Sequence, residues 1–332
     1  MDKETVFSIL KKEKLITGSS PEFKPLKGGV SSEIFLVTDG NNRCVVKQAL
    51  PKLKVDDDWF ADISRNENEQ EFLKFLQTIR LGSVPKLLYR DKNHHFFVME
   101  YLDEKFQNWK KEMLDGVFNP HTAKRAAELL AEIHLKSWEK EEIKRRFQKS
   151  ENFYSLRTEP YLVTTGKRHP ELKDQFFEEA ERLKNHQQAI VHGDFSPKNI
   201  MVKKDRIVLL DHEVAWFGDP AFDVAFFINH LYLKMLVHFK KSAEIQDLTN
   251  IIWTAYFERL GNQKLQQMEP RIIRLLLLLM LARIDGKSPV EYLEKDQKEF
   301  VRSFVKKHLR GQTFLHAKVN STWKEKLKEV YH

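Results

Sequence analysis

Between residues 24 and 102, hydrophobic positions mostly alternate with polar ones, which is the period of a half-buried strand. Short runs of β-branched and aromatic residues predict strands over residues 33–37, 44–48 and 96–101, with turn-forming residues between them. A helical period interrupts them over residues 66–79, where the apolar side chains fall on one face. The pattern therefore predicts a small antiparallel sheet with one inserted helix.

After residue 102 the helical period dominates. Asn119 followed by Pro120 is a typical helix start, and apolar helices are predicted over residues 122–138, 171–185, 221–239, 246–260 and 269–283. Capping-box sequences predict two further helix starts, at Ser288-Pro289-Val290-Glu291 and at Thr322-Trp323-Lys324-Glu325. We therefore expect an α+β chain with an N-terminal lobe over residues 1–102 and a mainly helical C-terminal lobe over residues 103–332.

One part of the helical lobe reads as a β-hairpin, because Lys203-Lys204-Asp205 separates two apolar segments, residues 199–202 and 206–210. Asp194 and Asn199 lie at its start and Asp211 follows its end, so we expect these three side chains to converge. Such oxygen donors suit Mg²⁺, and a carboxylate held off the metal can accept a proton from a hydroxyl. The simpler alternative is that Asp and Asn gather in loops because they favour turns.

Composition restricts the class of protein. The 332 residues suffice for about two domains, and 41% hydrophobic with 31% charged residues exclude a disordered or membrane-embedded chain. Cys44 is the only cysteine, which excludes an intramolecular disulfide and a cysteine metal site. The N-terminus lacks a signal-peptide pattern, and the longest apolar run is far shorter than the about 20 residues that span a bilayer. We therefore expect a cytoplasmic protein.

The net charge of +8 raises the question of a polyanionic partner. Residues 301–332 carry eight Lys or Arg against two Asp or Glu, so most of the excess charge lies at the C-terminus. A protein that follows a phosphate backbone normally spreads its basic residues along the binding face. The charge fits the solvated face of a terminal amphipathic helix better, and nucleic-acid binding is not expected.

The residues around the hairpin resemble a known catalytic core. His192-Gly193-Asp194 with Asn199 and Asp211, followed by Gly218-Asp219-Pro220-Ala221-Phe222-Asp223, is similar to the core of the aminoglycoside phosphotransferase and choline kinase-like superfamily. The resemblance implies a two-lobed protein-kinase-like fold and transfer of the γ-phosphate of ATP to a hydroxyl of a sugar, amino alcohol or aminoglycoside-like acceptor. It makes Asp194 the base, with Asn199 and Asp211 holding Mg²⁺.

The N-terminal lobe has candidates for the remaining ATP contacts that this resemblance implies. Gly28, Gly29 and Ser31 lie in a loop before a strand and would cover the phosphates, although a Gly-Gly pair is more often a plain turn. Lys47 ends an apolar strand and would pair with phosphates and with a helix carboxylate, for which Glu67, Glu69 and Glu71 are candidates and Glu69 is chosen. Backbone groups of Glu100 and Leu102 would contact the adenine.

The segment Asp211-His212-Glu213 departs from the usual antibiotic kinases and resembles the D-x-E form of methylthioribose kinases. Glu213 is predicted as a second metal ligand, with solvent exposure as its alternative. Asp223 is expected to brace the catalytic loop and His192 to hydrogen-bond the backbone. Arg283, Asp285, Gly286 and Lys287 could line an acceptor pocket or simply end a helix.

Other functions remain compatible with the pattern. A kinase-like module without catalysis usually lacks one of the residues that Lys47, Asp194 and Asp211 represent, and all three are present here. A basic nucleic-acid or membrane-surface protein would leave the core motif unexplained. The acceptor, the choice between ATP and GTP, and the state as monomer or homodimer are left open by the sequence.

Overall fold

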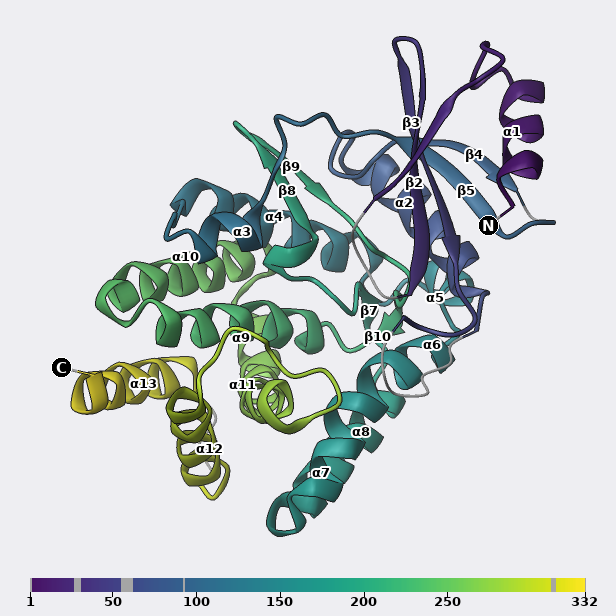
Figure 1. The fold of residues 1–332 in the computed structure, drawn as a ribbon. Coiled ribbons are helices and arrows are strands. Elements are labelled where there is room, and N and C mark those ends of the chain that lie inside the picture. Colours follow the sequence, from purple (N-terminus) through teal and green to yellow (C-terminus); the bar gives the residue numbers. More distant parts are fainter. Residues whose placement is uncertain (1, 27–30, 55–61, 92, 312–314, 332) are drawn as a thin grey trace. The chain divides into compact units, whose positions relative to one another are not determined.

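The computed structural model describes residues 2–26, 31–54, 62–91, 93–311 and 315–331. The chain divides into two compact units, whose helices and strands are labelled in Figure 1. The first comprises Met1–Phe106 together with Val208–Glu213, and the second comprises Gln107–Ile207 together with Val214–His332. Asp211 and Glu213 therefore belong to the first unit, whereas Asp194 and Asn199 belong to the second.

The first unit is built on a five-stranded antiparallel sheet in the order β1-β2-β3-β5-β4. Its strands are β1 (Glu22–Pro25), β2 (Ser32–Asp39), β3 (Asn42–Ala49), β4 (Leu87–Asp91) and β5 (Phe96–Glu100). Asp39-Gly40-Asn41-Asn42 makes the tight β2–β3 turn, where Gly40 takes the left-handed φ of +58° that glycine adopts without a steric penalty. The three strands predicted from alternation are confirmed.

In the described residues of the first unit, two helices accompany this sheet, and one of them was predicted from the sequence. Helix α1 (Lys3–Lys12) places Val6 and Leu10 in a core cluster with strand side chains such as Val46 and Val98. Helix α2 (Arg65–Ile79) confirms the predicted helix and buries Glu69 beside its apolar residues. Because neighbouring strand residues point to opposite faces, Val46 faces the cluster with α1 and Lys47 faces away from it.

The second unit is mainly helical. Its α-helices are α3 (Trp109–Leu114), α4 (Pro120–Ser137), α5 (Glu141–Arg146), α6 (Glu151–Phe153), α7 (Thr164–Arg168), α8 (Lys173–Asn185), α9 (Ala221–Val237), α10 (Ser242–Leu260), α11 (Asn262–Asp285), α12 (Lys295–Leu309) and α13 (His316–Tyr331). A π-helix (Tyr154–Val163) joins α6 to α7, and short 3₁₀ turns cover Pro170–Leu172, Pro197–Asn199 and Phe239–Lys241. Helix α9 contacts both α10 and α11 and is buried along almost its whole length.

Short strands carry the loops that hold the motif residues. Strand β7 (Ala189–Val191) pairs with β10 (Trp216–Gly218), and β6 (Gln107–Asn108) pairs with β8 (Ile200–Lys203), which lies next to β9 (Arg206–Leu209). The predicted hairpin is therefore present as β8 and β9. The α+β class, with its antiparallel sheet and helical remainder, is confirmed.

Both predicted capping boxes are wrong. The carbonyl and hydroxyl of Ser288 accept hydrogen bonds from Arg283, and α12 begins only at Lys295, where Glu294 and Gln297 form the capping box. Thr322 lies inside α13, and its hydroxyl donates to the carbonyl of Lys318 one turn earlier. Tertiary and intrahelical partners therefore occupy both hydroxyls that the local pattern assigned to caps. Within the described ranges, no helix is both long and apolar enough to cross a membrane.

Candidate functional site

In the first unit, Lys47 lies between two carboxylates. Its Nζ is 2.8 Å from Glu69 on α2 and 2.9 Å from Oδ1 of Asp211, the residue that follows Leu210 after β9. Glu67 is exposed, and Glu71 pairs with Arg90 at 2.9 Å, so the carboxylate at Lys47 is Glu69, as predicted. Helix α2 buries Glu69 because it falls on the same face as Phe72, Leu73 and Leu76.

Burial and charge act in opposite directions on Lys47. Burial alone would lower the pKa of this ammonium, but the adjacent Asp211 and Glu69 outweigh it and raise the pKa above its usual value. For the Glu69 carboxyl, burial raises the pKa, and the charge of Lys47 partly offsets this rise. The result is a fixed cation within a nearly dry part of the unit, which is the environment in which a charge acts most strongly on a ligand.

Asp211 adopts a backbone conformation that few residues tolerate. Its φ of +65° lies in the left-handed region, where Asp and Asn are several-fold enriched among non-glycine residues. The next residue, His212, stacks on Phe72 at 4.6 Å between ring centroids with an interplanar angle of 12°. The stacking and the ion pair with Lys47 together hold this strained turn in place.

Glu213 is buried, so the alternative that it faces solvent is wrong. Its Oε2 accepts from Nε of the fully buried Arg65 at 3.0 Å. Arg65 also donates to the carbonyls of Asp62, at 2.9 Å, and of Ser31, at 2.7 Å. This arginine therefore ties Glu213 to the start of α2 and to the backbone that precedes β2.

The other nucleotide-contact candidates of the first unit are distributed along the sheet. Gly28 and Gly29 lie outside the described residues, and Ser31 is a buried residue just before β2. Glu100 ends β5, and its backbone N–H donates to the carbonyl of Lys86 at 2.8 Å. Leu102 follows in the irregular segment after β5.

In the second unit, the loop between β7 and β8 is held by Asp223, near the start of α9. The Asp223 carboxylate accepts the backbone N–H of His192 at 2.6 Å and that of Gly193 at 2.8 Å. Nδ1 of His192 in turn accepts the backbone N–H of Asp194 at 3.1 Å. The bracing role expected of Asp223 and the backbone hydrogen bond expected of His192 are both confirmed.

Gly193 allows this loop to approach its neighbours. Its φ is +77°, and a Cβ at this position would lie 2.8 Å from a methyl group of Val214 and 3.2 Å from the ring of Phe153. Both the backbone conformation and the lack of space therefore require glycine between His192 and Asp194.

Two cations lie at the Asp194 carboxylate. Nη2 of Arg157 is 3.0 Å and Nζ of Lys198 is 3.5 Å from its Oδ2. Arg157 comes from the π-helix and also donates to the carbonyls of Gly193 and Leu156. Asn199 donates its side-chain N–H to the carbonyl of Asp194 at 3.0 Å, so the loop closes on itself between the two motif residues.

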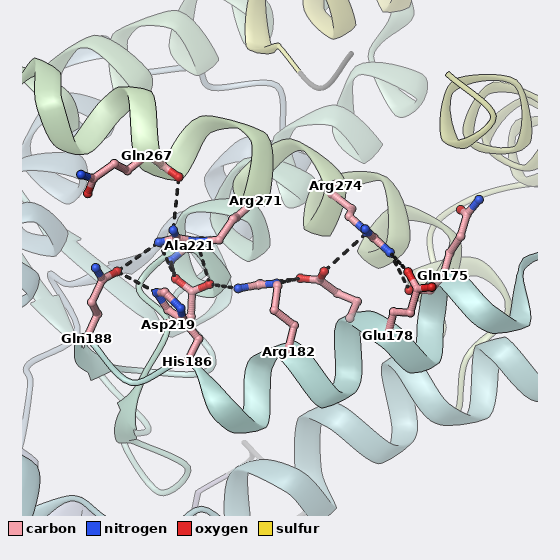
Figure 2. Close-up of polar contacts among 11 residues, drawn as sticks. Gln175, Glu178, Arg182, His186, Gln188, Asp219, Ala221, Gln267, Arg271 and Arg274 are labelled. Atoms are coloured by element: carbon pink, nitrogen blue, oxygen red, sulfur yellow. Dashed lines mark hydrogen bonds and ion pairs between the residues drawn. The ribbon is translucent and has the colours of Figure 1, made fainter. Parts of the chain in front are cut away.

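The segment before α9 is fixed by a network of buried charges. Figure 2 shows the carboxylate of Asp219 flanked by Arg182 of α8 and Arg271 of α11, with Gln188 contacting Arg271 at 3.0 Å. Asp219 also accepts the backbone N–H of Ala221 at 3.0 Å. Burial would raise the pKa of Asp219, but Arg182 and Arg271 reverse the effect and lower it. This network secures the turn that leads to Asp223.

The donor set fits a hard divalent cation. The Asn199 amide uses its N–H group to bind the Asp194 carbonyl, so its oxygen is the atom that can bind a cation. Carboxylate and amide oxygens are the ligands that Mg²⁺ prefers. Within the described ranges, no three His, Cys, Asp or Glu side chains form a ready-made metal cluster. A cation that takes few protein ligands and completes its shell with phosphate and water does not require one.

Two residues that hold candidate side chains were not predicted from the sequence, namely Arg65 in the first unit and Arg157 in the second. Neither falls in a recognisable motif, and Arg157 precedes Pro160 in a π-helix that no periodicity predicts. The sequence offers no signal for Arg65, because its complete burial, which arginine rarely shows unless it is paired, is visible only in the structure.

The fold is that of the protein-kinase-like phosphotransferases. An amicoumacin kinase structure, in complex with AMP-PNP, Ca²⁺ and its ligand, matches with a TM-score of 0.59 over 95% of this chain and 98% of that one, at 14% identity. Choline kinase from Cryptosporidium parvum matches with a TM-score of 0.54 over 99% and 96% of the two chains, also at 14% identity.

The family itself follows from the sequence match. The profile of the phosphotransferase enzyme family matches residues 22–242, and the chain belongs to that family. Methylthioribose kinase of Citrobacter koseri is 26% identical over 266 residues, which cover 67% of this chain and 64% of that enzyme. The chain thus spans slightly less than two thirds of the length of this relative. The superfamily resemblance inferred from the motifs is confirmed.

Proposed function

We propose that the protein is an ATP- and Mg²⁺-dependent phosphotransferase that moves the γ-phosphate to a hydroxyl of a small-molecule acceptor. The observation that carries this proposal is the buried Lys47, held 2.8 Å from Glu69 and 2.9 Å from Asp211. A buried lysine flanked by two carboxylates fits a site that binds a charged ligand, because charged groups with perturbed pKa values gather at functional sites. Membership of the phosphotransferase enzyme family supports the same reading.

The proposed roles divide between the two units. In the first, Lys47 binds the phosphates, Ser31 lies in the loop that covers them with Gly28 and Gly29, and the backbone at Glu100 and Leu102 contacts the adenine. In the second, Asp194 orients the acceptor hydroxyl. Asn199, Asp211 and Glu213 are the proposed ligands of Mg²⁺, which when bound would neutralise charge on the phosphates.

Catalysis would come from positioning the two reactants and from stabilising the charge on the transferred phosphoryl group. The acceptor oxygen forms its bond to the γ-phosphorus as the bond from that phosphorus to the β–γ bridging oxygen breaks, and ADP leaves. The hydroxyl proton passes to the Asp194 carboxylate, whose Oδ2 lies near Arg157 and Lys198. These cations are placed to stabilise the negative charge that the transferred group carries.

The test combines an acceptor screen with two matched substitutions. ATP consumption is measured with sugars, amino alcohols and aminoglycosides, and with methylthioribose because a relative carries that activity in its name. Asp194→Asn should lower kcat by about 10²- to 10⁴-fold, the usual contribution of a positioned base. The control is Asp205→Asn in the β8–β9 turn, where the side chain is 83% exposed. Retention of wild-type turnover by Asp194→Asn would refute the proposal.

A further inference from the structure

Besides Arg157 and Lys198 at Asp194, the second unit contains another group of cations, which surrounds a buried lysine. Lys234, near the end of α9, is fully buried. Among the described residues, its Nζ donates one hydrogen bond, of 3.3 Å, to the carbonyl of His230 in the same helix. It lies 5.3 Å from the centroid of the Tyr292 ring. Buried lysines are almost always paired with a carboxylate, so this one calls for an explanation.

The polar atoms around Lys234 are also unsatisfied. His230 is 8% exposed, and its Nε2 is buried without a hydrogen-bond partner among the described residues. The same holds for the hydroxyl of Tyr292 and for Nε of Arg283. Native proteins leave few such groups unpaired, and a cluster of them commonly marks a place where a ligand or water belongs.

Further cations extend this cluster towards solvent. Arg283 lies 5.7 Å from the ring centroid of Tyr161, and Arg157, which pairs with Asp194, lies 6.0 Å from the same ring. Lys110 lies 5.6 Å from the ring of Tyr292 and pairs with the exposed Glu291. Tyr161 thus connects the Asp194 carboxylate, through Arg157, to the cations around Lys234.

Nearby Asp285 and Lys287, which the sequence also offered for an acceptor pocket, are already paired. Asp285 binds Arg302 at 2.7 Å and His169 at 2.9 Å, and Lys287 binds Glu159 at 2.9 Å. Of the polar residues 283–287, Arg283 is therefore the one that joins the cluster. It donates to the carbonyl and hydroxyl of Ser288, which hold its guanidinium in place.

The electrostatics of the cluster favour an anion. Burial, together with the nearby Lys110 and Arg283 and opposed by Glu291, lowers the pKa of Lys234 to about 7. Burial lowers the pKa of His230 well below its usual value, and Lys234, Arg283, Lys198 and Lys110 act in the same direction. An anionic group bound here would offset the mutual repulsion of these cations.

We propose that the acceptor carries an acidic group, a carboxylate or a phosphate, which Lys234, Arg283 and His230 bind while its hydroxyl is presented to Asp194. This inference rests on the proposed function, because it names the class of acceptor for that reaction. It excludes polycationic acceptors, which the cluster would repel. Tyr161 and Tyr292 would line the path of the acceptor with rings that carry a polar hydroxyl.

The experiment uses matched sets of compounds that differ in the acidic group. Glycerate and glycerol 3-phosphate are compared with glycerol, and gluconate and glucose 6-phosphate with glucose, within a wider panel of sugar acids and hydroxy acids. Binding to the full chain is measured by calorimetry and turnover by ATP consumption, each at one ionic strength. The carboxylate and phosphate arms distinguish the two sources of the anion.

Lys234→Met removes the charge while keeping an unbranched side chain of similar length. It should weaken binding of the acidic compounds about ten- to hundredfold, as expected for the loss of a charged hydrogen bond, and leave neutral compounds unaffected. The matched control is Lys241→Met, because Lys241 also has a 3.3 Å carbonyl bond, to Gly116, and lies 5.9 Å from the ring of Phe118. Arg283→Gln provides a second variant should Lys234→Met be unfolded.

The outcomes separate the two proposals. Preference for acidic compounds that Lys234→Met abolishes would support the inference. Equal or better binding of the neutral members, absence of binding by every acidic compound, or an unchanged Lys234→Met would overturn it. Absence of ATP consumption with every acceptor would count against the phosphotransferase proposal, whereas turnover of a neutral or cationic acceptor would support that proposal and refute the acidic acceptor.

Discussion

The ammonium of Lys47 on β3 lies 2.8 Å from the carboxylate of Glu69 on α2, and both side chains are almost completely buried. The pair joins the sheet of the first unit to its inserted helix. Because Asp211 is also 2.9 Å from the same ammonium, Lys47 is held from two directions. Its position is therefore fixed before any ligand arrives, which is the condition for strong electrostatic stabilisation.

Replacing Lys47 should abolish most of the activity. We expect Lys47→Met to lower kcat/KM for ATP about 10²- to 10³-fold, a loss typical of removing one charged or polar group that stabilises a transition state. Glu69→Gln should act in the same direction and less strongly, because Asp211 still holds the ammonium. Steady-state kinetics at varied ATP concentration measure both effects.

Glu71→Gln is the matched control, since Glu71 lies on the same helix and pairs instead with Arg90 at 2.9 Å on the partly exposed side. Its kcat/KM should stay within about twofold of wild type, as surface ion pairs contribute little. A Glu71→Gln enzyme as impaired as Glu69→Gln would contradict the assignment of Glu69 as the functional carboxylate.

Asp223 should act on turnover by positioning the loop of Asp194. In Asp223→Asn, one of the two oxygens that accept the N–H groups of His192 and Gly193 becomes a donor. We expect a fall in kcat of about 10²-fold, the cost of a small misplacement of reacting groups, with little change in the KM for ATP. Kinetics below the melting temperature, together with circular dichroism, separate misplacement from unfolding; a raised KM with normal kcat would argue against this role.

Asp219 should matter for stability. Asp219→Asn leaves Arg182 and Arg271 facing each other without their common carboxylate, so the free energy of unfolding should fall by about 3–5 kcal/mol. Glu178→Gln removes the partner of Arg274 in the same region (Figure 2), but that carboxylate is 67% exposed and the change should stay below about 1 kcal/mol. Chemical denaturation measures the free energy of unfolding of both variants. Equal losses would show that the buried Asp219 network contributes no more to stability than an exposed ion pair.

The pKa of Asp219 also predicts a pH dependence. Since its pKa is lowered in the folded protein, its contribution to stability is present above the usual value of 3.8 and is lost as the pH falls through the folded value. The stability difference between wild type and Asp219→Asn should therefore shrink in acid. Denaturation curves at several acidic pH values test this, and a constant difference would contradict it.

Lys234 predicts a second pH dependence, in the range between neutral and alkaline pH. Its pKa falls from 10.5 to about 7 on folding, so the unfolded chain binds the extra proton between these values and the buried ammonium costs stability at neutral pH. Lys234→Met should therefore be more stable than wild type at pH 7 by about 1–3 kcal/mol, the cost of an unsatisfied buried polar group. The gain should vanish as the pH approaches 10.5. A variant less stable at every pH would show that the lysine is a structural support.

Local sequence patterns predicted the helices and strands whose own residues follow a helical or strand period. The alternation of β2, β3 and β5 and the apolar stripe of α2 are properties of consecutive residues, and the structure confirms them. Helix α1 was missed although Asp2 caps it and Val6 and Leu10 fall on one helix face, whereas the π-helix has no common period. The false start at Ser288 shows the same limit, since Arg283 takes the hydroxyl that the motif assigned to a cap.

The sequence by itself determined the family and the loop residues His192, Gly193, Asp194 and Asn199, because the spacing of these side chains is set by the covalent chain. Only the tertiary structure decided which carboxylate meets Lys47, that Arg65 holds Glu213, and that Arg157 reaches Asp194. It also buried Lys234 beside unsatisfied polar groups. These pairings join residues distant in the chain, and their energies depend on burial and direction, which no local pattern of residues records.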